Sequence, residues 1–303
     1  MSKKEKVVRE YGNNVAPWWR WLLAALLALA VGGMLGAIVG YIIQRIPIFK
    51  EGAYLYPEQE LLVGLASFAG IYLMFAVFVK KICKTKLRDF LFGAGRRPDI
   101  KGAWKLGGIF VICLILSSLV DIKYIELDFF DPVLWVINLV FVLLFLWMQT
   151  TTEEIFFRGL FLRVPFGNEM PSLKKGMIAA VISSLAFMSL HLPNPEVTSR
   201  SGIDAIIIAS SYFLSGMSMF VPNLYLGGME AGVLIHWLNN FICFVVIRQD
   251  VTVMPTPALL VDRIPLTSPL RTLATVVIAE VPVMVISLIL LIKREKKAEE
   301  NVE

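Results

Sequence analysis

Residues 132–164, PVLWVINLVFVLLFLWMQTTTEEIFFRGLFLRV, carry the clearest structural signal in the chain. The first half of this segment is apolar except for Asn138, and about 20 apolar residues are enough for an α-helix to cross a bilayer. The apolar pattern resumes after two glutamates, so we expect one helix that continues until just before Pro165. Such a helix would have about 33 residues and a length of roughly 50 Å. Because this exceeds what a bilayer requires, one end must project or tilt.

The rest of the chain has the same character. Of its 303 residues, 57% are hydrophobic and 17% are charged, and the mean hydropathy is +0.71. Soluble proteins have roughly 45–50% apolar and about 25% charged residues, so the composition excludes a disordered protein, a disulfide-rich secreted module and a soluble enzyme. We predict an all-α polytopic integral membrane protein with about eight transmembrane helices. The other apolar runs are residues 18–43, 61–80, 103–120, 176–192, 203–221, 228–247 and 272–292.

Basic residues gather at the N-terminus, at the C-terminus and in alternate connections between these runs. Lys and Arg mark the cytoplasmic side of a membrane protein, so an eight-span chain is expected to have both termini in the cytoplasm. The net charge of +5 and the pI of 9.0 then reflect orientation, and we expect no nucleic-acid partner. The basic residues are Lys3, Lys4, Lys6, Arg9, Lys80, Lys81, Lys84, Lys86, Arg88, Arg96, Arg97, Lys101, Arg163, Lys174, Lys175, Lys293, Arg294, Lys296 and Lys297.

The sequence contains no soluble second domain, repeat or low-complexity tract, so we expect a single membrane domain over residues 1–303. Within the first run, Gly32, Gly36 and Gly40 recur every four residues. This spacing lets another backbone approach closely. Packing inside the bundle is the favoured interpretation, and the interface of a homodimer is the alternative.

Ionisable residues inside apolar runs are costly and usually mark function. The first group is Glu153-Glu154-Ile-Phe-Phe-Arg158. Adjacent residues on a helix point about 100° apart, so the two carboxylates cannot share one face. Glu154 and Arg158 stand at i,i+4 in the favourable order for an ion pair, which leaves Glu153 free to face a cavity. The alternative is an acidic helix end that is solvated at the membrane interface.

The only two histidines of the chain also lie in apolar runs. His191 ends the segment Phe187-Met-Ser-Leu-His191, and His236 begins the segment His236-Trp-Leu-Asn-Asn240. A spacing of four places each histidine on one helix face with an aromatic or polar partner. A single intramembrane histidine is more often a packing residue than a catalyst, but the coincidence of both favours a functional site.

These residue types together are the parts of a peptide hydrolase. A carboxylate and an imidazole can hold and deprotonate a water molecule, while a second imidazole and a carboxamide can stabilise an oxyanion. The sequence has no G-x-S-x-G motif, and its three cysteines show no CxxC spacing. We therefore expect no serine or cysteine nucleophile and no cofactor. Zinc held by Glu153, His191 and His236 is the minor alternative, although no H-E-x-x-H motif is present.

The three motifs, in this order, resemble those of the CPBP family, the CAAX-processing intramembrane proteases and bacteriocin-immunity proteins also called the ABI family. The similar core runs over residues 132–247. The resemblance implies a metal-independent glutamic protease in which Glu153 and His191 activate water. It also implies that His236 and Asn240 form the oxyanion hole, and that Glu154 and Arg158, with Phe187, hold the helix or the terminus of the substrate.

The resemblance also bears on partners and location. The composition and plain loops look like those of a prokaryotic member in the cell membrane, so a peptide, a bacteriocin or a membrane-protein segment is the expected substrate. Two other functions stay open. One is a non-catalytic membrane scaffold or bacteriocin-immunity protein of the same fold. The other is a proton-coupled transporter that uses the same buried groups as a relay.

Overall fold

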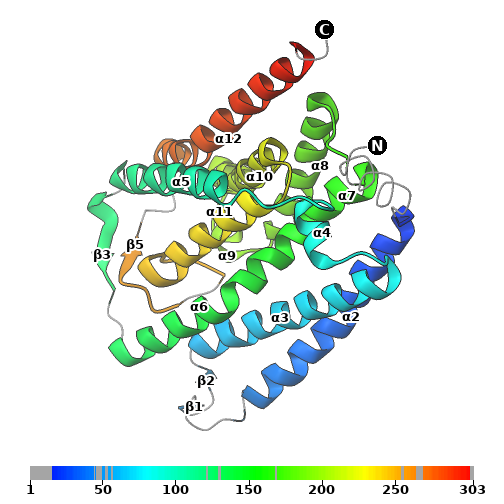
Figure 1. The fold of residues 1–303 in the computed structure, drawn as a ribbon. Helices are drawn as coiled ribbons and strands as arrows, with labels where there is room; N and C mark the ends of the chain where they lie inside the picture. Colours follow the sequence, from blue (N-terminus) through cyan, green and yellow to red (C-terminus); the bar gives the residue numbers. More distant parts are fainter. Residues whose placement is uncertain are drawn as a thin grey trace.

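A computed structural model describes residues 16–43, 45, 50–51, 54–55, 57–120, 122–128, 131–167, 169–253, 256–263 and 269–300. Long helices dominate it (Figure 1), and seven helices in the described residues are long and apolar enough to cross a membrane. The predicted all-α polytopic membrane fold is therefore confirmed. The main helices are α2 (Trp18–Ile43), α3 (Pro57–Ile82), α5 (Ile100–Val120), α6 (Pro132–Glu154), α8 (Leu173–His191), α10 (Gly202–Leu226), α11 (Glu230–Phe241) and α12 (Pro269–Glu300).

The remaining elements are short. Three are α-helical: α4 (Leu87–Phe92), α7 (Leu160–Phe166) and α9 (Pro195–Thr198). Another is the 3₁₀ turn η2 (Ile122–Tyr124), and two are π-helical turns, η3 (Ile155–Gly159) and η4 (Ile242–Val246). The strands are β1 (Lys50–Glu51), β2 (Tyr54–Leu55), β3 (Ile125–Leu127), β4 (Ile247–Gln249) and β5 (Leu260–Asp262).

One of the eight predicted crossings is shorter than expected. The apolar run at 228–247 forms α11 and η4, which together span Glu230–Val246 and fall short of the length of the other seven. The chain turns extended immediately afterwards, where β4 begins at Ile247. The eight predicted runs thus correspond to seven full-length helices and one shorter helix.

The expected helix of residues 132–164 is nearly continuous, but it does not stop before Pro165. Elements α6, η3 and α7 form one span, Pro132–Phe166, with Pro165 in its last turn. A proline this close to the end removes only one backbone hydrogen bond. The helix ends at Gly167, which has φ +60° and donates its N–H to the carbonyl of Arg163.

Contacts gather the basic connections at one end of the bundle. Arg96, after α4, contacts Glu230 at the start of α11, with Nη2 2.5 Å from Oε1. Arg163 in α7 donates to the carbonyl of Phe90 in α4, and Arg294 near the end of α12 donates to the carbonyl of Leu224 in α10. These three arginines belong to segments that were predicted to lie on one side of the membrane, and their contacts place them at the same end of the bundle. The N-terminal basic residues Lys3, Lys4, Lys6 and Arg9 lie outside the described residues.

The opposite end of the bundle carries a small sheet of order β3-β5-β4. Strand β5 pairs antiparallel with β3 and parallel with β4. An ion pair reinforces this end, because Arg248 Nε lies 2.7 Å from Asp128 Oδ2. The sheet links the end of α5, the end of η4 and the chain leading to α12, so it fixes how these helices sit relative to one another.

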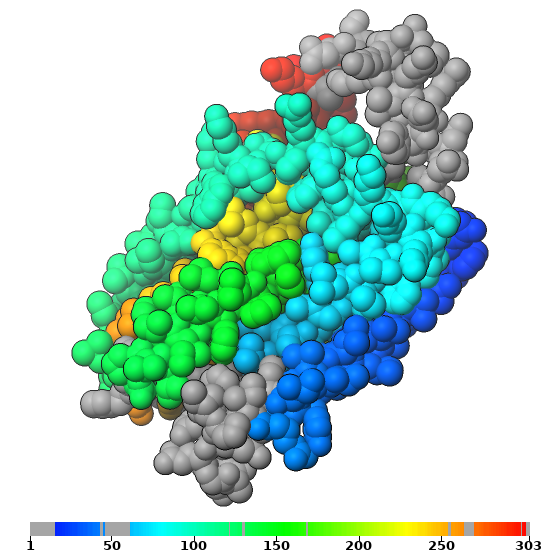
Figure 2. Space-filling view, turned by 60° about the horizontal axis from the view of Figure 1, so that its bottom comes forward, coloured from blue at the N-terminus to red at the C-terminus, as the bar shows by residue number. Residues whose placement is uncertain are grey.

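Helix α6 lies between α3 and α11 (Figure 2), and α10 packs against α8, α11 and α12. The glycine stripe of α2 faces α3 of the same chain. A Cβ added to Gly32 or Gly36 would overlap the backbone of Ile71 or Ser67. The stripe therefore packs inside the bundle, as the favoured interpretation predicted.

Candidate active site

The site forms where α6 and α11 run antiparallel, and side chains at the sheet end fix their register. The π-helical turn η4 leaves carbonyl groups for partners outside the helix. Trp135 Nε1 donates to the carbonyl of Val245 at 3.0 Å, and Asn138 Nδ2 donates to that of Phe244 at 2.8 Å. These bonds hold the two helices together on the side of the site that is nearest to the sheet.

The predicted ion pair between Glu154 and Arg158 is present. Arg158 Nη1 lies 2.9 Å from Glu154 Oε1, and both side chains are fully buried. The guanidinium also stands 4.5 Å from the ring centre of Phe187 and donates to the carbonyl of Gly216. Full burial favours the structural role expected of this pair over contact with a substrate terminus.

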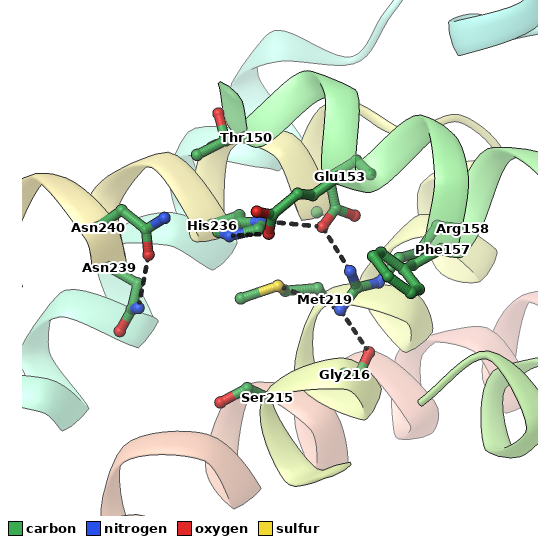
Figure 3. Close-up of polar contacts among 12 residues, drawn as sticks. Thr150, Glu153, Phe157, Arg158, Ser215, Gly216, Met219, His236, Asn239 and Asn240 are labelled. Carbon is green, nitrogen blue, oxygen red and sulfur yellow. Dashed lines mark hydrogen bonds and ion pairs between the residues drawn. The ribbon is translucent and has the colours of Figure 1, made fainter. Parts of the chain in front are cut away.

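His236 lies between the two glutamates. Its Nδ1 is 3.0 Å from Glu154 Oε1, and its Nε2 is 3.4 Å from Glu153 Oε2. Figure 3 shows the imidazole and the Glu153 carboxylate pointing toward one another from α11 and α6. A proton on Nδ1 that is shared with Glu154 leaves Nε2 directed at Glu153, so the buried ion pair fixes how the imidazole is presented.

A row of amide side chains continues from Glu153 along the interface of the two helices. Gln149 Nε2 donates to Glu153 Oε1 at 2.6 Å, and Asn240 Nδ2 donates to Gln149 Oε1 at 3.2 Å. Asn239 Nδ2 in turn donates to Asn240 Oδ1 at 3.1 Å. The network thus joins Glu153, His236 and Asn240, three of the four predicted catalytic residues.

The fourth, His191, is the last residue of α8. Its ring stacks on Tyr212 with centroids 4.5 Å apart and stands 4.2 Å from the ring of Phe187. Its Nδ1 lies 2.7 Å from the carbonyl of Phe187. None of the hydrogen bonds or ion pairs within the described ranges joins His191 to Glu153. Phe187 connects the two histidines, since its ring centre is 6.1 Å from that of His236.

The sequence motifs missed a face of α10. Tyr212 contacts His191, Gly216 and Met219 contact Arg158, and Asn223 contacts α11. These residues recur at the three- and four-residue spacing of one helix face. That spacing was the available signal, but none of the four is charged, so the search for ionisable residues passed over them. Gln149, one turn before Glu153, escaped for the same reason.

A glycine lets the acidic pair approach α11. A Cβ on Gly232 would lie 2.6 Å from Glu154 Oε2 and 2.8 Å from the carbonyl oxygen of Met219. Its N–H donates to Asn223 Oδ1 at 2.7 Å. Any larger residue here would push Glu154 away from His236.

The arrangement provides a buried acid–imidazole pair with fixed amide donors beside it. Across the described ranges, no group of three His, Cys, Asp or Glu residues has the geometry to hold a metal ion. Such a site can activate water and stabilise a developing negative charge.

Comparison with known families points to a protease. Residues 134–242 match the family model described as type II CAAX prenyl endopeptidase Rce1-like. The matched range contains all seven predicted site residues. Searches of curated proteins and of solved structures found no match. The match supports a protease, and the apolar helices fit a multi-pass membrane protein. Over residues 134–242 this chain therefore shows the similarity to the CPBP family of membrane proteases that its motifs predicted.

Proposed function

We propose that this protein is an intramembrane endopeptidase in which Glu153 activates a water molecule. The observation that carries the proposal is the difference in exposure between the adjacent acids. The Glu153 side chain is 14% exposed, whereas Glu154 is 0% exposed and held by Arg158. Glu153 is thus the carboxylate of the pair that a water molecule can reach, while Glu154 contacts Nδ1 of His236, the ring nitrogen that faces away from Glu153.

The proposed reaction begins when Glu153 takes a proton from the water. The water oxygen bonds to the carbonyl carbon of the peptide and the negative charge moves to the carbonyl oxygen. The carbon–nitrogen bond then breaks, and Glu153 returns the proton to the departing amine. A general base of this kind typically contributes roughly 10²–10⁴-fold to a rate.

Two side chains beside Glu153 suit the oxyanion of this reaction: Asn240 donates from its amide, and His236 donates from Nε2 when both of its ring nitrogens carry a proton. His236 is held by Glu154, and the Asn240 amide is held by Gln149 and Asn239. Donors that are already oriented stabilise a charge without reorganising as it forms. His236 and Asn240 therefore form the proposed oxyanion hole.

His191 completes the proposed site as a second acceptor for the water. If its Nδ1 donates to the carbonyl of Phe187, at 2.7 Å, then Nε2 carries the free lone pair. Contacts with the rings of Phe187 and Tyr212 limit rotation of the His191 imidazole. Water bound between His191 and Glu153 would have both of its protons engaged.

The proposed substrate is a peptide or a membrane-protein segment that enters from the bilayer. The name of the matching family model makes a prenylated CAAX peptide the first substrate to assay, with its unprenylated form beside it. The proposed mechanism is metal-independent, so cleavage is expected to survive chelation. Loss of cleavage on chelation, with recovery on added zinc, would favour the metal alternative.

The decisive test is the substitution Glu153→Gln, which keeps the size of the side chain and removes the base. Membrane peptides from cells that carry the wild type and the variant are compared by mass spectrometry, and candidate peptides are then assayed with purified protein. Glu169→Gln, an exposed acid outside the helices, is the matched control. We expect cleavage in the wild type and in Glu169→Gln, and none in Glu153→Gln. Full activity in Glu153→Gln would refute the mechanism, and a phenotype that survives Glu153→Gln would favour the scaffold alternative.

A further inference from the structure

The last long helix, α12, carries a buried carboxylate outside the family motifs. Glu280 is 7% exposed and lies within an otherwise apolar part of Pro269–Glu300. It also lies beyond the range that the family model matches. An acid at this depth is costly to keep, so it requires partners.

Two serines of α10 supply hydrogen bonds to both of its oxygens. Ser215 Oγ donates to Glu280 Oε1 at 2.5 Å, and Ser218 Oγ donates to Oε2 at 2.5 Å. Hydroxyl donors offset part of the cost of burying a polar group, so the two serines tie Glu280 to this turn of α10.

The same turn of α10 contacts Arg158 on its other side. The Gly216 carbonyl and the Met219 sulfur both accept from Arg158 Nη2, each at 3.4 Å. In Figure 3, Gly216 and Met219 lie beside the guanidinium, whereas the Ser215 side chain points away from it. One helical turn thus lies between Glu280 and the ion pair that supports His236.

Charge connects the same groups. In its ionised form, Glu280 would attract Arg158 and a protonated His236. When a fully buried arginine contacts a single anion, their attraction offsets only part of the free energy that is needed to remove the arginine from water. A second ionised carboxylate nearby would reduce that cost.

We propose that Glu280 is a positioning residue for the active site, acting through Ser215 and Ser218 on Arg158. The inference rests on the proposed protease function. Glu280 would fix the turn that holds Arg158, so that Glu154 and His236 keep their places, and in its ionised form it would also compensate the charge of Arg158. It does not contact the reacting atoms, so its loss should lower kcat and leave KM nearly unchanged.

The test compares Glu280→Gln, the double change Ser215→Ala with Ser218→Ala, and Ser287→Ala. Ser287 is the control, since it is a buried polar residue of the same helix. We expect kcat to fall about 10- to 100-fold in Glu280→Gln, as for other residues that orient a catalytic group through a second side chain. KM should change less than about two-fold, within the range of weak effects. Ser287→Ala should keep the wild-type kcat.

Combining the three substitutions tests whether the serines act through Glu280. Residues that act on one another have non-additive effects, so the triple variant should be no slower than the slower of its two parents. Independent, multiplying losses would overturn the proposal, as would a wild-type kcat in Glu280→Gln. A fall in thermal stability that accounts for all lost activity would also overturn it.

Glu153→Gln measured beside these variants separates the two proposals. If Glu153→Gln is inactive while Glu280→Gln matches the wild type, only the positioning role fails. If Glu153→Gln is fully active, the proposed function itself fails.

Discussion

Two pairs of neighbouring helices in this bundle are joined in different ways. In the pair α2–α3, Gly32 and Gly36 bring the two backbones into contact with Ile71 and Ser67. In the pair α6–α11, polar side chains fill the interface and bond to one another. Both pairs are apolar on average, so hydropathy alone does not distinguish them.

The difference in packing indicates that α2–α3 contributes to folding stability and α6–α11 to catalysis. Close contact between backbones gains van der Waals packing, which is a main source of helix association in lipid. Long polar side chains hold helices farther apart and leave groups that can react. Substitutions in α2–α3 should therefore reduce folding, whereas substitutions in α6–α11 should reduce turnover.

The largest expected effect is at Arg158. Arg158→Met leaves Glu154 buried without its cation, a change that costs about 3–5 kcal/mol in soluble proteins. We expect activity to fall about 1,000-fold or more, as when a group that fixes a catalytic histidine is removed. Thermal unfolding in detergent and single-turnover cleavage would measure the two effects.

A second variant distinguishes them. Replacing Glu154 by Leu in the Arg158→Met background removes both charges, and replacing a buried ion pair by apolar residues is often neutral or stabilising. Stability should then return while cleavage stays absent, because His236 has lost its support. Recovery of both together would mean that the pair matters only for folding.

The next effect is at Gln149, the residue that the sequence motifs missed. Gln149→Leu keeps the volume but removes the donor to Glu153 Oε1 and the acceptor for Asn240. We expect kcat to fall about 100-fold, the lower end of what the loss of one oriented donor costs. Gln249→Leu, on an exposed residue of β4, is the control and should keep full activity.

A smaller effect, on folding alone, is expected in α2–α3. Gly36→Ala places a Cβ on the backbone of Ser67, and overpacking of this kind costs about 1–3 kcal/mol. Gly33→Ala is a matched control, because within the described ranges no atom lies within 4 Å of its added Cβ. Thermal unfolding should separate the two variants, and activity per folded molecule should equal that of the wild type in both. A loss of turnover in folded Gly36→Ala would show that α2–α3 also shapes the site.

The sequence was sufficient to predict the spans and the Glu154–Arg158 pair. Each depends on local properties, either the length of an apolar run or a spacing of four along one helix. The end of the long helix was missed by two residues, because a proline in a final turn costs only one hydrogen bond.

The contacts between helices were not predictable in the same way. Helical periodicity states which residues share a face, but not which face of another helix opposes it. The bonds from Asn240 to Gln149 and from Ser215 to Glu280 depend on the register of α6 with α11 and of α10 with α12. Glu280 was itself visible as a charge in an apolar run, but it had no partner at helical spacing to mark it.

The smallest expected effect is at Cys83, just beyond the end of α3, where it packs with residues of α2 and α4. Burial raises the pKa of its thiol to about 11 and outweighs the opposite effect of Arg20. At pH 8 only about one thiol in 1,000 would then be ionised, against roughly one in four for a cysteine of ordinary pKa. Because the thiolate is the reactive form, alkylation of Cys83 should be at least about 100-fold slower than alkylation of an exposed cysteine. Its rate should rise about tenfold per pH unit up to a pH of about 11. Mass spectrometry of the peptide that contains Cys83 would follow the rate.

Cys83→Ala should leave turnover unchanged, which would place this end of α2–α3 outside the chemistry. Fast alkylation at pH 8 would contradict the burial of Cys83, and a loss of kcat in Cys83→Ala would show that the separation between the two helix pairs does not hold here.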